Sequence, residues 1–207
     1  MRTKWYFAFL AIAAAFCFIL FTLVVKSHRL DSFDFNTTVR LQDHIPVKLD
    51  TMFSYLSLIG SAEVISALLV ILLILRRKLI GGLIAFSLFA AAHFTELIGK
   101  TFLHHPGPPY LFFRYNLGLE FPSSYVQPGS SYPSGHSLRA VFLAILLTYF
   151  IMTTKKLKHK VLFLIPIYLL LAATLVSRVS LGEHWTTDVI GGSLLGGSIA
   201  FLSLIFL

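Results

Sequence analysis

The sequence predicts an all-α protein, a bundle of six membrane-spanning helices with both termini on the cytoplasmic side of the membrane. Of its 207 residues, 57% are hydrophobic and only 13% are charged. Apolar runs long enough to cross a bilayer recur along the chain. Lysine and arginine gather at alternate breaks between these runs, as they do in cytoplasmic loops. We therefore expect a single integral membrane domain over residues 1–207.

The first expected span is Trp5–Val25, which contains no charged residue. Arg2 and Lys4 precede it and resemble the start of a signal peptide. The apolar run is too long for one, and no small-residue cleavage site follows clearly, so we predict a retained anchor helix. Cys17 lies inside this run and, as the only cysteine, can form no disulfide within the chain.

Five further spans are expected at about 53–75, 79–103, 135–152, 161–176 and 189–207. Gly192 and Gly196 lie one helical turn apart in the last of them, which favours close packing against another helix. Residues 26–51 separate the first two spans. Phe33, Phe35 and other apolar residues recur there among polar ones, which fits either a short amphipathic element on the membrane or a solvated loop.

The distribution of basic residues predicts the orientation in the membrane. Six spans place both termini on one side, together with Arg2, Lys4, Arg76–Lys78 and Lys155–Lys160. The stretches on the opposite side carry nearly balanced charges, so the termini are expected inside. The net charge of +8 does not indicate nucleic acid as a partner, because no basic face with interleaved aromatic residues lies outside the spans.

The stretch before the fourth span combines three residues that could act on an anion. Ser134 can donate a hydrogen bond, Gly135 lets backbone N–H groups approach closely, and His136 can shuttle a proton near neutral pH. The first turn of a helix also favours negative charge. Ser-Gly before a helix is equally a common N-cap, so this stretch alone leaves a structural role open.

A second candidate stretch precedes the last span. His184 and Asp188 are four residues apart, which would place them on one helical face. A carboxylate on one imidazole nitrogen fixes the tautomer and makes the other nitrogen a better nucleophile. Arg178 offers a planar guanidinium that suits phosphate oxygens. The alternative is that Arg178 and Asp188 are interfacial anchors at the ends of adjacent spans.

Lys100 is an ionisable residue near the outer end of the third span, and such residues usually mark function. The alternative is that its side chain reaches the membrane interface. Glu96 lies one turn earlier and is expected to be its charge partner, and His93 to be a hydrogen-bonded interior histidine. Clusters with metal-ligand spacing are missing from the sequence, so neither a metal nor another cofactor is expected.

Lys100, Pro133–His136 and the run from Arg178 through His184 to Asp188 resemble, in order and spacing, the three motifs of the type 2 phosphatidic acid phosphatase superfamily. This superfamily includes membrane lipid phosphatases, glucose-6-phosphatases and soluble vanadium haloperoxidases. The motif-bearing core covers about 100–188, and the six expected spans match the membrane branch over the whole chain.

The resemblance implies a role for each motif residue. His184 would attack phosphorus and carry a phosphohistidine, Asp188 would orient it, and His136 would protonate the leaving group. The equatorial phosphate oxygens would be held, without a metal, by Lys100, Arg178, Ser134 and the N–H of Gly135. This agrees with the need of phosphoryl transfer for positioning and positive charge.

The chain departs from the family pattern at one position. The first motif of the family is Lys, six residues, then Arg-Pro, but the count from Lys100 reaches Gly107. His105-Pro106 stands where a second Arg-Pro is often found. His104, His105, Arg139 or Arg114 could replace the missing cation, and we favour Arg114 as a phosphate-binding residue. The alternative is that Arg114 is a solvated loop charge or binds lipid headgroups.

The function implied by the resemblance is metal-independent hydrolysis of phosphoric monoesters or diphosphates of lipids at the outer face of a bacterial plasma membrane. Undecaprenyl pyrophosphate, phosphatidylglycerophosphate and phosphatidate are the substrates that the family suggests. Two alternatives stay open: a lipid-linked phosphotransferase, and a catalytically weakened membrane protein that binds lipid phosphate. The expected partners are the lipid substrate and membrane lipids, and the sequence leaves the oligomeric state open.

Overall fold

The computed structural model describes residues 2–77, 79–119, 121 and 130–207, and every regular element in those ranges is helical. This confirms the all-α prediction. Two short 3-10 helices, Val47–Leu49 and Tyr110–Phe112, accompany the α-helices. The α-helices are α1 Arg2–Lys26, α2 Asp31–His44, α3 Asp50–Ile59, α4 Ala62–Leu75, α5 Leu79–Phe102, α6 Gly135–Thr153, α7 Lys160–Ser180 and α8 Thr186–Leu204.

Within the described ranges, five helices are long and apolar enough to cross a membrane, namely α1, α5, α6, α7 and α8. The sixth expected span, 53–75, is broken. The segments Val47–Ile59 and Ala62–Leu75 together pass the same test but are bent by 54°. Ser61 lies at the break, and its hydroxyl accepts the N–H of Val64 at 3.3 Å, so a new helix N-terminus begins there.

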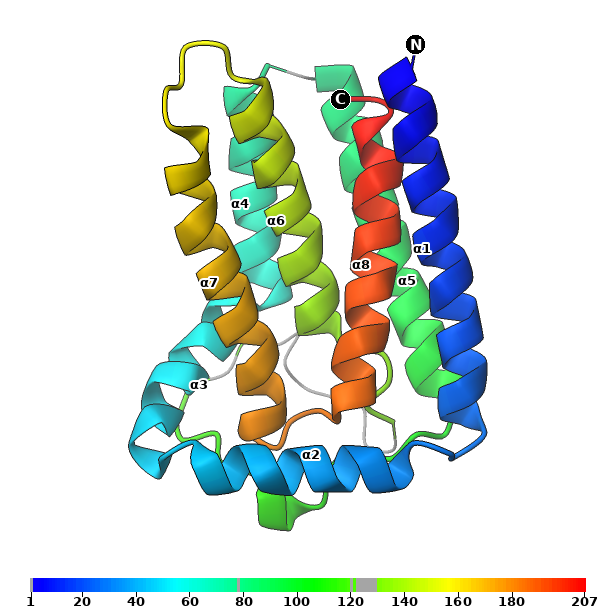
Figure 1. The fold of residues 1–207 in the computed structure, drawn as a ribbon, viewed down its shortest axis with the longest axis vertical. Helices are drawn as coiled ribbons and strands as arrows, with labels where there is room; N and C mark the ends of the chain where they lie inside the picture. Colours follow the sequence, from blue (N-terminus) through cyan, green and yellow to red (C-terminus); the bar gives the residue numbers. More distant parts are fainter. Residues whose placement is uncertain (1, 78, 120, 122–129) are drawn as a thin grey trace.

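The spanning helices run side by side, and both chain termini lie at the same end of the bundle (Figure 1). This arrangement is the one that six crossings require. Helix α2 lies across the opposite end, roughly perpendicular to the spans (Figure 1). The basic loops after α4 and α6 are at the end that holds the termini, and the assignment of that end to the cytoplasm stays a prediction.

Residues 26–51 were expected to be either a short amphipathic element or a solvated loop. Most of this polar stretch is helical, as α2, which favours the first alternative. Asp34 and Thr38 are buried, whereas Phe33 and Phe35 are exposed. Near its C-terminus, Gln42 Nε2 donates to the carbonyl oxygens of Phe112 at 2.7 Å and Ser180 at 2.9 Å. These contacts fasten α2 to the end of α7 and to the 3-10 helix Tyr110–Phe112.

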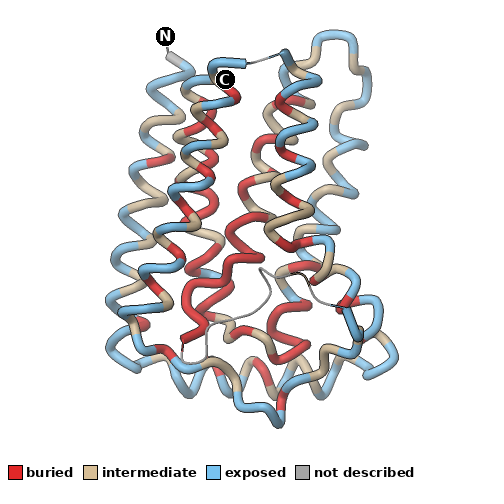
Figure 2. Tube along the Cα trace, turned by 180° about the vertical axis from the view of Figure 1, so that it is seen from behind, coloured by how far each residue is buried: buried red, intermediate tan, exposed pale blue. Residues whose placement is uncertain are grey.

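The core lies between α4, α5, α6 and α8, and buried residues are concentrated along the inner helices and at the end where α2 crosses (Figure 2). Helices α6 and α8 approach very closely. A Cβ at Gly192 would lie 2.2 Å from the carbonyl oxygen of Ser134, and one at Gly196 would lie 2.2 Å from that of Leu138. Only glycine fits at both positions, which confirms the predicted close approach.

Candidate active site

The stretch Pro133–His136 leads into the N-terminus of α6. Ser134 is the N-cap, and its Oγ accepts the N–H of Ser137 at 3.4 Å, so the capping role is present. A Cβ at Gly135 would lie 2.2 Å from Glu96 Oε1, and therefore only glycine lets α6 begin against α5. His136 follows in the first turn. It is buried, and its Nε2 has no hydrogen-bond partner in the described part of the chain.

Arg178 lies in the last turn of α7, which continues to Ser180 and so extends beyond the predicted end at 176. Its side chain is fully buried. The guanidinium contacts the carboxylate of Glu183 and the hydroxyl of Ser57, and its Nη2 donates to Ser177 Oγ at 3.0 Å. Arg178 is therefore fixed in place, with one anionic partner at the site.

His184 and Asp188 meet, but not on a common helical face as predicted. Helix α8 begins at Thr186, so His184 belongs to the preceding turn and Asp188 to the first turn of the helix. The carboxylate of Asp188 accepts the N–H of Trp185 at 2.8 Å, and this capping contact folds the turn back. His184 Nδ1 then lies 3.5 Å from Asp188 Oδ2, with both residues buried.

Lys100 is paired with Glu96 at 2.7 Å, which confirms the predicted charge partner. The other oxygen of Glu96 lies 3.9 Å from Nη1 of Arg139, a buried residue of α6. His93 is partly buried, and its Nδ1 lies 2.9 Å from the carbonyl oxygen of Phe89, as expected for an interior histidine. Two cations therefore share one buried carboxylate beside the N-terminus of α6.

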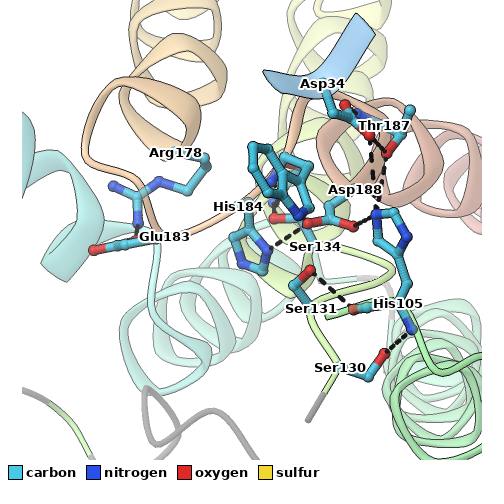
Figure 3. Close-up of polar contacts among 12 residues, drawn as sticks. Asp34, His105, Ser130, Ser131, Ser134, Arg178, Glu183, His184, Thr187 and Asp188 are labelled. Carbon is cyan, nitrogen blue, oxygen red and sulfur yellow. Dashed lines mark hydrogen bonds and ion pairs between the residues drawn. The ribbon is translucent and has the colours of Figure 1, made fainter. Parts of the chain in front are cut away.

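These groups converge at one end of the bundle. His136 of α6 lies within electrostatic reach of Arg139 on the same helix, Arg178 of α7, His184 of the turn before α8, and Lys100 of α5. Arg178, His184, Asp188 and Ser134 lie close to one another beneath α2 (Figure 3). Two histidines and three cations therefore lie at one end of the bundle, an arrangement that suits transfer of an anionic group.

Arg114 occupies a different place from the one expected of a phosphate ligand. Its guanidinium donates to the carbonyl oxygens of Gln42 at 3.2 Å and Ile45 at 3.4 Å, at the C-terminus of α2. These contacts describe a helix cap. A contribution of Arg114 to phosphate binding stays a prediction. Among the residues that the structure describes, a Cβ at Gly107 would meet only the side chain of Ser131, at 3.4 Å from Cβ and 3.7 Å from Oγ.

A second histidine, His105, contacts the carboxylate of Asp188. Its Nε2 lies 3.4 Å from Asp188 Oδ1 and 3.9 Å from the carboxylate of Asp34 (Figure 3). Asp34 accepts two hydrogen bonds from Thr187, one from its N–H at 2.8 Å and one from its hydroxyl at 2.6 Å. Burial raises the pKa of Asp34 above its ordinary value, and the charge of Asp188 adds to this effect.

Sequence reasoning missed Asp34, Thr187, Ser57 and Glu183 as members of this end of the bundle. Asp34 and Ser57 are distant in sequence from every motif, and no local pattern marks them. Glu183 adjoins His184, so the motif itself was a signal for it. Within the described residues, no group of three or more histidine, cysteine, aspartate or glutamate side chains is arranged to hold a metal ion.

The family model of the PAP2 superfamily matches residues 80–207, which include all of these motif residues. The chain belongs to the PAP2 superfamily. The resemblance seen in the sequence is thereby confirmed. The match includes α5, α6 and α7, which carry Lys100, His136 and Arg178, and also α8, which begins two residues after His184.

Similar proteins extend the likeness to nearly the whole chain. Phosphatidylglycerophosphatase B of Bacillus subtilis (strain 168) is 27% identical over 159 residues, 74% of this chain and 73% of that protein. The crystal structure of a transmembrane PAP2 type phosphatidylglycerolphosphate phosphatase from Bacillus subtilis aligns with a TM-score of 0.76 at 21% identity, over 95% of this chain and 94% of that one.

The structure of LpxE from Aquifex aeolicus aligns with a TM-score of 0.63 at 22% identity, over 83% of this chain and 94% of that one. The homologues of this chain are thus lipid phosphatases of the PAP2 superfamily. Together with the apolar helices, they identify this chain as an integral membrane protein of a phosphatase superfamily.

Proposed function

We propose that this chain hydrolyses the phosphate or pyrophosphate group of a membrane lipid through a phosphohistidine on His184. The observation that carries the proposal is that the N-terminus of α6, which holds His136, is hydrogen-bonded through Ser134 to Asp188 at 3.0 Å, in the segment that holds His184 and follows Arg178. A nucleophile, an acid and a cation in one buried site are the parts that metal-free phosphoryl transfer requires.

The first step forms the phosphoenzyme. Asp188 faces Nδ1 of His184 at 3.5 Å, so the proton is assigned to Nδ1 and the lone pair to Nε2. Nε2 attacks phosphorus, the new P–N bond forms, and the P–O bond to the lipid breaks. The leaving oxygen takes the proton of His136, whose Nε2 makes no other hydrogen bond in the described part of the chain.

The second step regenerates the enzyme. His136, now neutral, accepts a proton from a water molecule as that water attacks the phosphohistidine. The P–N bond breaks, inorganic phosphate leaves, and His184 recovers its lone pair. One residue thus acts as acid in the first step and as base in the second.

Charge on the transferring group would be held by Arg178, Lys100, Ser134 and the N–H of Gly135. Arg178 is paired with Glu183 and Lys100 with Glu96, so both cations are already oriented by carboxylates. A phosphate group that displaces these contacts would meet preorganised positive charge. We therefore propose a reaction that needs no metal ion.

A lipid substrate is supported by the surroundings of His136. An apolar cavity of about 120 Å³ lies between α4, α6 and α7 and borders Gly60. A Cβ at Gly60 would lie only 3.1 Å from Cδ2 of His136, so this cavity adjoins the acid. Hydrocarbon next to the leaving-group side of the site suits a lipid better than a soluble phosphate ester. The basic loops at the other end support a site that faces outward.

Phosphate release from a panel of lipids tests the proposal. Purified protein in detergent would be given phosphatidylglycerophosphate, which the relative from Bacillus subtilis suggests, and beside it undecaprenyl pyrophosphate and phosphatidate. A soluble phosphomonoester serves as the matched control. We expect inorganic phosphate from at least one lipid, with a base-stable and acid-labile phosphoryl group on the peptide that contains His184.

Two results would contradict the proposal. The proposed hydrolase activity is wrong if no lipid in the panel releases phosphate. The lipid specificity is wrong if the soluble ester is turned over as efficiently as the lipids. Transfer of the phosphoryl group to an added alcohol without free phosphate would identify a phosphotransferase instead.

A further inference from the structure

Asp188 has two histidine neighbours, one at each oxygen of its carboxylate (Figure 3). Oδ2 faces His184 Nδ1 at 3.5 Å and accepts the N–H of Trp185 at 2.8 Å. Oδ1 is buried, makes no hydrogen bond by strict geometry within the described residues, and lies 3.4 Å from His105 Nε2. His105 therefore faces the oxygen that the catalytic pair leaves unused.

The surroundings of His105 Nε2 assign its proton. Three oxygen atoms lie near it, from Asp188 at 3.4 Å, Asp34 at 3.9 Å and Thr187 at 3.4 Å. The hydroxyl of Thr187 donates a hydrogen bond to Asp34 at 2.6 Å, so its oxygen, like the two carboxylate oxygens, can only accept a hydrogen bond from His105. A nitrogen surrounded by acceptors must carry the hydrogen, and Nε2–H then lies between Thr187 Oγ1 and Asp188 Oδ1, each at 3.4 Å.

The backbone around His105 is held firmly enough to aim this group. Its carbonyl oxygen accepts the N–H of Ser131 at 2.9 Å, and its N–H approaches Ser130 Oγ at 3.4 Å. The next carbonyl, that of Pro106, accepts the indole N–H of Trp185 at 2.8 Å. The loop that carries His105 is thus tied to the segments on either side of the catalytic groups.

Two buried carboxylates, Asp34 and Asp188, flank the imidazole of His105, each no more than 2% exposed. Burial of two like charges side by side is costly unless a donor lies between them. Asp34 is oriented by its two bonds from Thr187, the residue directly before Asp188. Helix α2, through Asp34, therefore packs against one side of the His105 imidazole.

We infer that His105 is a positioning residue for the reaction: its Nε2–H holds Oδ1 of Asp188, so that Oδ2 keeps its orientation toward His184. The inference rests on the proposed role of His184 as nucleophile. At 3.4 Å the contact is long, as catalytic hydrogen bonds often are before substrate is bound. An apolar residue at 105 would leave a buried carboxylate oxygen without a donor and free to rotate.

Glutamine and asparagine at position 105 separate this role from mere packing. The amide nitrogen of glutamine lies about as far from Cα as Nε2 of histidine does, whereas that of asparagine is one bond shorter. His105→Gln, His105→Asn and His105→Leu would be compared with wild type on the best lipid substrate. His28→Leu is the matched control, because His28 lines the same surface cavity as His105 but does not contact Asp188.

We expect kcat to fall about 10- to 100-fold in His105→Leu and His105→Asn, the range for residues that orient a ligand through a second group. KM should stay within about threefold, because His105 does not touch phosphate, and His105→Gln should recover most of kcat. His28→Leu should resemble wild type. If His105→Leu is poorly folded, the comparison of His105→Gln with His105→Asn still decides.

Equal kcat in the glutamine and asparagine variants, or a change confined to KM, would overturn the inference. These outcomes are distinct from failure of the proposed function, in which wild type itself releases no phosphate from any lipid. In that case the inference falls with the function on which it rests.

Discussion

The backbone N–H of Ser134 donates to the carbonyl oxygen of Asp188 across 3.0 Å. This hydrogen bond joins the residue that caps α6 to the first turn of α8. His136 and His184 lie within a few residues of its two ends, so the proposed acid and the proposed nucleophile belong to one packed unit. The close approach of α6 and α8 at Gly192 keeps that unit rigid.

His184→Ala should abolish phosphate release, because the proposed mechanism forms the P–N bond on Nε2 of His184. We expect a loss of about 10⁴-fold or more in kcat, the scale seen when a catalytic nucleophile is removed. Turnover by the purified variant is the measurement, and thermal unfolding in detergent checks its fold. His44→Ala, an exposed histidine of α2, is the control, and a His184→Ala enzyme with a tenth of wild-type activity would refute the covalent mechanism.

Activity should survive EDTA and be inhibited by vanadate. Arg178 and Lys100 are proposed to supply the positive charge that a metal ion supplies in other phosphatases. Vanadate can take the trigonal bipyramidal geometry of the transferring phosphoryl group and should bind more tightly than substrate. Initial rates with each reagent are the measurement. Activity lost with EDTA and restored by Mg²⁺ would point to a different catalytic design.

Arg114→Ala tests two roles in one variant. The contacts with Gln42 and Ile45 predict a lower unfolding temperature, because the C-terminus of α2 loses its cap. The phosphate-binding hypothesis predicts in addition that kcat/KM falls. The loss should correspond to about 1.5–3 kcal/mol of transition-state stabilisation, the range for a hydrogen bond to a charged group. Gly107→Arg should then recover part of the loss. A lower unfolding temperature with unchanged kcat/KM would leave Arg114 as a cap alone.

Asp34 should make the stability of the protein depend on pH. Since burial raises its pKa in the folded state above the ordinary 3.8, the folded protein keeps this proton at pH values at which the unfolded chain has lost it. The stability contributed by the bound proton is present below 3.8 and is lost as the pH rises through the folded-state pKa.

Unfolding temperatures of wild type and Asp34→Asn, measured from about pH 3.5 to 7, test this dependence. The unfolding temperature of the asparagine variant should increase relative to that of wild type as the pH rises, because asparagine has no proton to release. Asp43→Asn, exposed on the same helix, should follow wild type throughout. Parallel curves for wild type and Asp34→Asn would show that Asp34 has an ordinary pKa.

The predicted orientation can be measured by labelling introduced cysteines in intact cells, after Cys17 is replaced by serine. Asp43 on α2 and Lys156 in the α6–α7 loop are both exposed and lie near opposite ends of the bundle. Asp43→Cys should react with an impermeant maleimide, and Lys156→Cys should react only after the cells are permeabilised. The reverse pattern would place the site at the cytoplasmic face.

The spanning helices were predictable because long apolar runs with charged breaks have few other solutions. The break between α3 and α4 was not predictable. Gly60 and Ser61 end one helix and begin the next, but the residues on both sides are apolar, so the sequence reads as one hydrophobic run. The turn that carries His184 was missed for a similar reason. The spacing to Asp188 fits a helical face, but the carboxylate instead caps α8 through Trp185.

The motif residues were predictable because the chemistry requires those side chains at fixed local spacings. Their supports were not, because Asp34 reaches Thr187 only through the tertiary fold. The environment of Arg114 was hidden for the same reason, since the partner carbonyls lie on a helix that the sequence left undecided. Local patterns thus indicated the residues proposed to react, and tertiary packing determines which side chains hold them.

The first and last helices of the chain lie against each other, since α1 packs on α8 and Asp34 binds the first turn of α8. A ribosome delivers α1 to the membrane long before α8 exists. The contacts of α1 with α8 can therefore form only once α8 has been made, whereas Thr22 and Phe7 of α1 can meet Tyr132 and Tyr149 earlier. Contacts between residues so far apart in sequence close slowly, so the proposed catalytic centre is expected to assemble only after α8 has entered the membrane.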